Sequence, residues 1–250
     1  DGLVMSMHKF LGGVGAPGVL VIKKALLAQS LMKPPSDAGG GTVFFVGDTW
    51  HRYLENLEER EEGGTPNILG AVRAGLAFQI KEAIGDGVIH DEEEALLSLV
   101  WDRLKRNTNL HILGHETAKR LPIISFNVRA PKPFSNLLVH YGFVSALLND
   151  LFGIQARGGC ACAGPYALRC LGISHERAKD IESHLLRKQE ILRPGFVRVC
   201  FHYAMTGEDA QYILNAIEFI AAKGWAFLPL YHFKKDSGEW VHRRLMARGF

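Results

Sequence analysis

The most informative stretch of this sequence, residues 6–22, reads Ser6-Met7-His8-Lys9-Phe10-Leu11-Gly12-Gly13-Val14-Gly15-Ala16-Pro17-Gly18 followed by Val19-Leu20-Val21-Ile22. Four glycines and one proline stand within seven of these residues, a composition that favours a tight turn with close approach of the backbone. The apolar run that follows predicts a buried strand over Val19–Lys23. The turn would then hold Lys9 where two strands meet.

Two interpretations of Lys9 are open at this point. Lysines are usually exposed, so Lys9 could simply end a strand before a hairpin. Alternatively, a partly desolvated lysine loses its proton readily and can attack a carbonyl carbon to form a Schiff base. Ser6 and His8 are hydrogen-bonding side chains of the kind that hold a phosphate beside such a carbonyl. This combination favours the second interpretation.

The Ser-x-His-Lys segment with its glycine-rich turn resembles the cofactor-binding lysine segment of the class V aminotransferases, which include cysteine desulfurases and selenocysteine lyases. The resemblance implies that Lys9 forms a Schiff base with pyridoxal 5'-phosphate and that Ser6 and His8 contact the phosphate. In that family the groups that bind the pyridine ring precede the lysine, whereas only eight residues precede Lys9 here. The resemblance therefore implies the C-terminal part of a longer chain.

The expected fold class is α/β, as the C-terminal part of a fold type I pyridoxal-phosphate enzyme. We expect residues 1–88 to be the end of a large cofactor-binding sheet domain. A helix over 91–106 would connect it to a smaller α+β domain over residues 89–226, and residues 227–250 would form a tail.

Length and composition limit the other possibilities. The chain has 250 residues, 47% of them hydrophobic, which is enough for one large core or two modest ones. The net charge is only +3 and shows no dense basic patch, which disfavours a nucleic-acid partner. No signal peptide and no apolar stretch long enough to span a bilayer are expected, so no membrane partner is predicted. Four cysteines without a disulfide framework favour a soluble, cytoplasmic protein in a reducing compartment.

Hydrophobic periodicity and breaker residues predict the remaining elements. The expected strands cover residues 42–46, 110–114, 121–129 and 195–202. The expected helices begin near Asn67 and at Thr206 and cover residues 134–152, 165–171 and 174–189, with a loop at 34–41. The last helix is predicted to start with a capping box formed by Thr206 and Asp209, and to turn Ile213, Ile217 and Ile220 inward.

A second phosphate contact is implied at Gly63-Gly64-Thr65-Pro66-Asn67. A helix that starts near Asn67 offers unpaired backbone N–H groups to an anion, although an ordinary capped helix has the same signature. In the resembled family a Gly-Thr-Pro at this distance contributes its threonine to the cofactor phosphate, commonly of the partner subunit. The resemblance thus implies a phosphate contact by Thr65 and a homodimer.

Cys160 and Cys162 stand in Arg157-Gly158-Gly159-Cys160-Ala161-Cys162. A metal site needs about four ligands, and no second paired half is present, so no metal is predicted. The pattern is similar to the Arg-x-Gly-x-x-Cys loop of cysteine desulfurases, in which the final cysteine forms the persulfide. Either thiol could take that role here, because Cys160 occupies a position that usually holds a bulkier or polar residue. Cys170 and Cys200 are expected to be buried structural cysteines.

Arg198 completes the predicted site. It lies in Phe196-Val197-Arg198-Val199-Cys200, which is similar to the strand whose arginine binds the substrate carboxylate in the family. A planar guanidinium suits bidentate binding of a carboxylate. The resulting hypothesis is a pyridoxal-phosphate enzyme acting on an amino acid, like a cysteine desulfurase or an aminotransferase. The alternative is an incomplete, non-catalytic fragment or interaction module that retains the family motifs.

Overall fold

The structure is a computed structural model that describes residues 1–27 and 33–246. It contains two compact units, Asp1–Val88 and Ile89–Phe250, and the division falls within one long helix. The last four residues of the expected tail, 247–250, lie outside the described residues.

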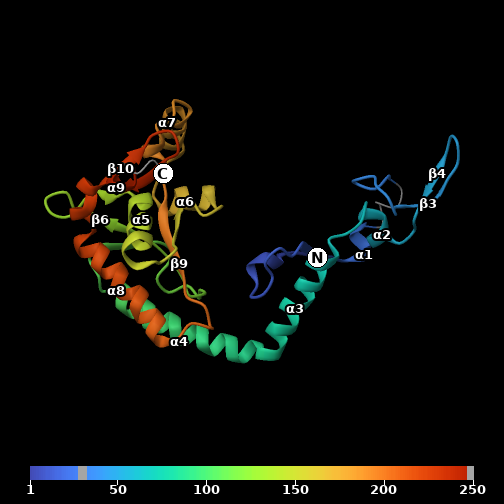
Figure 1. The fold of residues 1–250 in the computed structure, drawn as a ribbon, viewed down its shortest axis with the longest axis horizontal. Helices are drawn as coiled ribbons and strands as arrows, with labels where there is room; N and C mark the ends of the chain where they lie inside the picture. Colours follow the sequence, from blue (N-terminus) through green and yellow to red (C-terminus); the bar gives the residue numbers. More distant parts are fainter. Residues whose placement is uncertain (28–32, 247–250) are drawn as a thin grey trace. The chain divides into compact units, whose positions relative to one another are not determined.

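The first unit is built from short antiparallel strand pairs and helices, drawn in blue to blue-green in Figure 1. Strand β1 pairs with β2 so that Ser6 lies opposite Gly18, and β3 pairs with β4. The predicted strands at 19–23 and 42–46 and the helix near Asn67 are confirmed to within one residue. The expectation that the strand at 19–23 is buried is wrong, because Leu20 and Val21 are exposed. In chain order the elements are β1 (Gly2–Ser6), η1 (Met7–Lys9), β2 (Gly18–Ile22), α1 (Lys24–Leu27), β3 (Val43–Val46), β4 (His51–Tyr53), α2 (Leu57–Glu61) and α3 (Ile68–Ile84).

The second unit begins inside α4 (Asp86–Leu104) and combines one sheet with several helices. Helix α4 starts five residues before the predicted helix at 91, because only Gly85 interrupts the helical pattern and Gly87 lies inside the helix. The later elements are β5 (Leu110–Ile112), β6 (Ile123–Arg129), β7 (Leu138–Val139), α5 (Tyr141–Phe152), β8 (Arg157–Gly159), α6 (Gly164–Cys170), α7 (His175–Leu186), η3 (Glu190–Leu192), β9 (Phe196–Cys200), α8 (Gly207–Lys223), η4 (Gly224–Leu230), β10 (Tyr231–Lys234), β11 (Glu239–His242) and α9 (Arg243–Met246).

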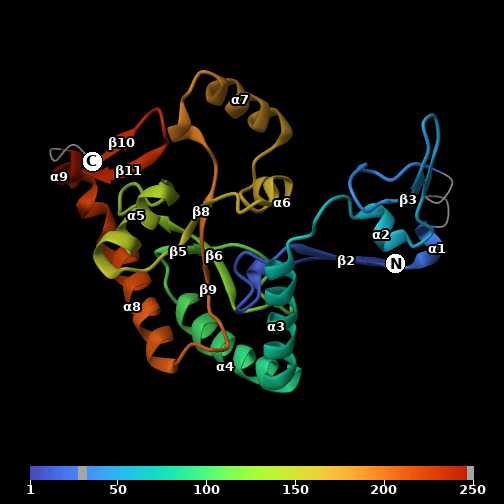
Figure 2. The same cartoon turned by 45° about the vertical axis from the view of Figure 1, so that its right-hand side comes forward.

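The main sheet has the order β5-β6-β9-β8, with β7 also paired to β6, and all its pairs are antiparallel. Alternate residues of β6 and β9, including Phe126 and Val197, point to one face, where helices α4, α5 and α8 complete the largest core. Figure 2 shows α5 and α8 beside this sheet. The predicted alternation of β6 is confirmed for Ile124, Phe126 and Val128.

The opposite face of this sheet is smaller and more polar. Phe196 and Leu113 pack there against Ala167 of α6. Ser125 and Asn127 of β6 alternate toward the same face, and Asn127 is buried although the sequence pattern predicted a solvated position.

Helix α5 begins at Tyr141, seven residues later than the predicted start at 134. Pro131 and Pro133 disfavour helix before this point, and β7 pairs with the end of β6 instead. The helix starts where His140 accepts a hydrogen bond from the backbone N–H of Gly142 at 3.0 Å. The apolar periodicity was therefore correct for α5 but could not locate its first turn.

Helix α8 carries the predicted capping box, with Thr206 and Asp209 bonded reciprocally. Ile217 and Ile220 are buried as predicted, whereas Ile213 is only half-buried. By length and composition alone, Gly207–Leu230 could cross a membrane, so the expectation that no stretch is long enough is wrong. Its buried side packs into the main core, which accounts for its apolar composition in a folded unit.

The expected tail is largely structured. Strands β10 and β11 form a hairpin that packs on α5, and Tyr231 donates a hydrogen bond to Asp150 at 2.8 Å. This hairpin belongs to the second compact unit.

Candidate active site

The lysine turn is anchored on helix α3 of the first unit. Met7 is fully buried and packs with Ala74 and Ala77 of α3, so its neighbours His8 and Lys9 remain exposed. A β-carbon on Gly13 would lie 1.9 Å from the Met7 carbonyl oxygen. Only glycine fits this close approach of the backbone, as the glycine-rich sequence suggested.

Helix α3 also holds the glycine-rich loop through two polar side chains. Asn67 accepts a hydrogen bond from Gly70 N–H at 2.9 Å, capping the helix, and donates to the Gly15 carbonyl at 3.4 Å. Arg73 donates to the Val14 carbonyl at 3.4 Å. Asn67 was not among the predicted site residues, although an asparagine before a helical pattern is a capping signal. These contacts tie the lysine loop to the start of α3.

The predicted phosphate-binding side chains are free in this unit. Ser6 is half-buried, and His8, Lys9 and Thr65 are exposed. Within the described residues, none of the four side chains makes a hydrogen bond or an ion pair. The expected desolvation of Lys9 is not seen in the first unit by itself. A hydroxyl, an imidazole and an amine thus stand within four consecutive residues, with no protein partner of their own.

The cysteine loop of the second unit is a tight turn between β8 and α6. The Ala163 N–H bonds to the Cys160 carbonyl at 2.9 Å, and the two residues between them, Ala161 and Cys162, have φ of 51° and 61°. Non-glycine residues in this left-handed region each cost roughly 1–3 kcal/mol and are concentrated at functional sites. The turn therefore holds Cys162 in a strained conformation.

The two thiols differ sharply in their surroundings. Cys162 is exposed and its Sγ accepts a hydrogen bond from Arg157 Nη2 at 2.7 Å. Cys160 is half-buried and its thiol donates to the Pro194 carbonyl at 3.2 Å. Burial raises the pKa of Cys160, opposed by the positive charge of Arg193. Cys162 is thus presented beside a cation, while Cys160 is tied to the backbone before β9.

Arg198 lies on the polar face of the sheet. It pairs with Arg157 of β8 on one side and with Ser125 of β6 on the other, so the three side chains form a row on one face. Within the described part of the chain, its Nε is buried and has no hydrogen-bond partner. A buried N–H group without a partner is unfavourable, which makes the Nε of Arg198 a ready donor for a carboxylate.

A cavity of about 420 Å³ borders the cysteine loop. Arg157, Cys160 and Cys162 line one side, and Leu168 of α6 and Ile181 of α7 line another. Its size is in the range of small-molecule sites.

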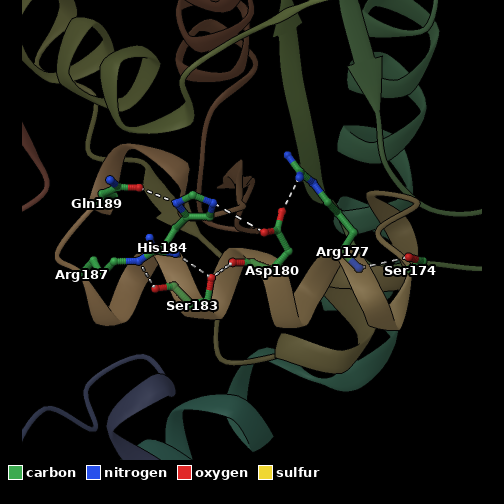
Figure 3. Close-up of polar contacts among 7 residues, drawn as sticks. All are labelled: Ser174, Arg177, Asp180, Ser183, His184, Arg187 and Gln189. Atoms are coloured by element: carbon green, nitrogen blue, oxygen red, sulfur yellow. Dashed lines mark hydrogen bonds and ion pairs between the residues drawn. The ribbon is translucent and has the colours of Figure 1, made fainter.

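Helix α7 carries a separate polar network, which Figure 3 shows in detail. His184 lies between Gln189, 2.6 Å from its Nδ1, and Asp180, 3.5 Å from its Nε2. Arg177 also contacts Asp180, and Ser174 caps the helix. All these contacts run along one helix and the turn after it, so they stabilise α7 and form no separate site.

Neither of the remaining cysteines is fully buried, so the expectation of buried cysteines at positions 170 and 200 is wrong. Cys170 is half-buried beside Phe196, and Cys200 is exposed at the end of β9. Position 200 falls on the same sheet face as Arg198 and is the last residue of β9. Among the described residues, no group of three or more histidine, cysteine, aspartate or glutamate side chains could hold a metal ion.

The family model for class V aminotransferases matches residues 1–213 of this chain. The chain belongs to the class V aminotransferase family. A probable cysteine desulfurase from Halalkalibacterium halodurans is 34% identical over 168 residues, covering 66% of this chain and 37% of the relative. The molybdenum cofactor sulfurase of Solanum lycopersicum is 28% identical over 232 residues, covering 87% of this chain and 28% of the relative.

A solved structure agrees with this membership. The apo cysteine desulfurase of Thermococcus onnurineus NA1 is 29% identical with a TM-score of 0.66, and the match covers 89% of this chain and 47% of that one. This chain therefore spans less than half the length of these relatives.

Class V aminotransferases are pyridoxal-phosphate enzymes, and the residues present fit this cofactor. The free hydroxyl of Ser6 and imidazole of His8 can donate to a phosphate, and the Lys9 amine can hold the aldehyde carbon. The close packing at Gly13 fixes the turn that carries them. The unpartnered Nε of Arg198 fits the carboxylate of an amino acid.

Proposed function

We propose that the full-length protein is a pyridoxal-phosphate-dependent cysteine desulfurase. The observation that carries this proposal is the contact between Arg157 and Cys162 at 2.7 Å in a strained, exposed turn. An exposed sulfur beside a cation is the setting of reactive cysteines, whereas Cys160 is half-buried and its thiol donates to a backbone carbonyl. The geometry thus favours Cys162 as the sulfur acceptor, a choice that the sequence left open.

The chain's own residues then have distinct roles. Arg198 binds the carboxylate of the substrate and orients it, and the Lys9 amine moves the proton at the substrate Cα. When bound, pyridoxal phosphate supplies an electron sink. The Cys162 sulfur forms a bond to the substrate sulfur as the carbon–sulfur bond breaks, and the electron pair of that bond stays with carbon. Ser6, His8 and Thr65 hold the phosphate.

The matched variants Cys162→Ser and Cys160→Ser of the full-length protein test the assignment. We expect Cys162→Ser to lower sulfide release from cysteine at least about a hundredfold, because it removes the acceptor atom. Cys160→Ser keeps a group that can donate to the Pro194 carbonyl and should retain most of the activity. Equal losses in both variants would contradict the assignment. No sulfide release from the wild-type protein would exclude desulfuration.

Other outcomes identify the alternatives. Amino-group transfer or epimerisation that persists in both cysteine variants would point to an enzyme in which the thiols are bystanders. A visible cofactor band that is unchanged in Lys9→Ala would rule out Lys9 as the residue joined to pyridoxal phosphate. A full-length protein that binds no pyridoxal phosphate would favour a non-catalytic interaction module.

The proposal includes a soluble homodimer in a reducing compartment such as the cytoplasm. The exposed Thr65 lies two residues before the cap of α3, where it is available to a phosphate of the partner subunit. Thr65→Ala mixed with Lys9→Ala should restore one intact site per mixed dimer if Thr65 acts across subunits. Activity of the mixture no greater than that of the separate variants would contradict this role.

A further inference from the structure

The C-terminal hairpin lies beyond the region that the family model matches, which ends at residue 213. Its Trp240 donates a hydrogen bond from Nε1 to Nδ1 of His140 at 3.0 Å, across 100 residues of sequence. Phe143 and Phe233 pack against the same indole ring, with centroids 5.1 and 5.4 Å away. The hairpin is therefore fixed to the first turn of α5.

His140 is held in one orientation. Its Nδ1 accepts from Trp240 and from the Gly142 N–H, each at 3.0 Å, so the ring proton is on Nε2. Within the described residues this Nε2 is buried and has no partner. A β-carbon on Gly142 would lie 3.1 Å from the imidazole and 3.3 Å from the indole. The imidazole thus has little room to turn.

The neighbouring ring of Tyr141 packs both on His140 and on the strand that precedes the cysteine loop. The His140 and Tyr141 rings are stacked, with centroids 4.5 Å apart and planes at 25°. The Tyr141 ring also fills the space left by two glycines, because a β-carbon on Gly158 or Gly195 would lie 2.9 or 2.6 Å from it. Gly158 precedes the cysteine loop in β8.

Gly195 lies in the segment before β9, which also contacts the cysteine loop. Gly195 follows Pro194, whose carbonyl accepts the hydrogen bond from Cys160. Tyr141 therefore lies beneath both backbone segments that hold the loop, β8 and the approach to β9. Burial raises the pKa of the Tyr141 hydroxyl, and Arg193, Cys160 and Glu190 lie close enough to act on it electrostatically.

We propose that Trp240, His140 and Tyr141 are positioning residues, through which the C-terminal hairpin fixes the stem of the cysteine loop and hence the placement of Cys162. This inference rests on the proposed function only in giving Cys162 the role of sulfur acceptor. The expected effect of these residues on the rigidity of the cysteine loop depends only on how Trp240, His140 and Tyr141 pack.

Trp240→Phe tests the first link in the full-length protein, because it keeps an aromatic ring but removes the donor to His140. We expect amide hydrogen exchange of residues 158–163 to become about tenfold faster. We also expect kcat for sulfide release to fall about tenfold with KM and the visible cofactor band unchanged. Trp225→Phe, at a half-exposed position of η4, is the matched control and should change neither.

Tyr141 tests the second link. Tyr141→Phe keeps the ring beneath Gly158 and Gly195 and should leave loop exchange at the wild-type rate, whereas Tyr141→Ala should accelerate it. Wild-type exchange in both Trp240→Phe and Tyr141→Ala would overturn the proposal, and so would equal acceleration in Tyr141→Phe and Tyr141→Ala. If the wild-type protein releases no sulfide, the proposed function fails while the exchange data still decide this inference.

Discussion

Cys160 and Cys162 are two positions apart in one turn, yet their thiols have different surroundings. Cys162 is held at positive φ with its sulfur beside Arg157, and Cys160 is tied to the Pro194 carbonyl. The sequence pattern places a thiol in this loop, but it could not choose between the two. The partner of Cys160 lies 34 residues further along the chain, and no local pattern reveals it.

The strain at Ala161 gives a prediction for stability. Ala161→Gly should raise the free energy of unfolding by about 1 kcal/mol, because glycine adopts the left-handed conformation without steric cost. Urea unfolding followed by circular dichroism measures the change. Ala222→Gly, at an exposed position of α8, should lower it by about 1 kcal/mol, because glycine is unfavourable in a regular helix. A destabilised Ala161→Gly would contradict the proposed strain.

Arg198 gives a prediction that separates binding from folding. Within the described residues its buried Nε has no hydrogen-bond partner, so Arg198→Met should leave the free energy of unfolding unchanged or raise it, while raising KM for the amino-acid substrate. Arg103 is the matched control, because it pairs with Glu218 through Nε and Nη2 at 2.7 and 2.6 Å. Arg103→Met should lower the free energy of unfolding by about 1–2 kcal/mol and leave KM unchanged. A wild-type KM in Arg198→Met would exclude substrate binding by this residue.

At the scale of the element, helix α5 connects distant parts of the second unit. It covers one face of the sheet, receives the C-terminal hairpin at its first turn, and supports β8 from below through Tyr141. The sequence predicted the apolar side of α5 but not its first residue. That start depends on His140, which is fixed by an indole from the end of the chain.

The contact of His140 with Trp240 and with the Gly142 N–H is expected to be sensitive to acid. Burial lowers the pKa of His140 below its ordinary value of 6.5, so the folded state holds the ring neutral while the unfolded chain takes up a proton near pH 6.5. The stability that this contact provides is therefore complete above about pH 6.5 and declines as the pH falls below it. His111 acts in the same direction, because burial and Arg129 lower its pKa too.

Urea unfolding of the wild-type protein and two variants at pH 8 and pH 5.5 measures this effect. The difference in unfolding free energy between the two pH values should become smaller in His140→Asn, which keeps a helix-capping acceptor that does not titrate. His111→Gln should remove the contribution of His111 to the same difference. An unchanged pH difference in His140→Asn would show that the imidazole is not held neutral.

At the scale of the whole molecule, the two units differ greatly in their cores. The first unit buries three hydrophobic side chains in its cluster, Met7, Ala74 and Ala77, while its strands expose Leu3, Val4 and Leu20. The second unit has a large core that includes Phe126, Phe143 and Leu214. Burial of apolar area is the main stabilising term in folding. The larger core therefore gives the second unit far more of this stabilisation.

This contrast predicts the behaviour of the separate units. A chain of residues 89–250 should unfold in one cooperative urea transition, whereas a chain of residues 1–88 should show none, because its buried apolar area is too small to offset the loss of chain entropy. Circular dichroism and amide proton dispersion in NMR spectra measure both. A cooperative transition in residues 1–88 would contradict the prediction.

The family motifs were therefore the part of this molecule that the sequence predicted best. The residues that position these motifs were the part that it predicted least. The lysine turn, the cysteine loop and the arginine strand each stand in a short local pattern that the sequence displays. The residues that hold them, such as Asn67 and Tyr141, act through contacts that only the fold creates.

The pairing of Arg157 with Arg198 on neighbouring strands has a further consequence. Two guanidinium groups directly opposite each other repel, and β8 is a short edge strand of three residues. An anion that binds both groups would reduce this repulsion, so its binding and the attachment of this edge strand become one linked equilibrium. Under the proposed function, bound substrate would therefore stabilise the attachment of β8, the strand that precedes Cys162.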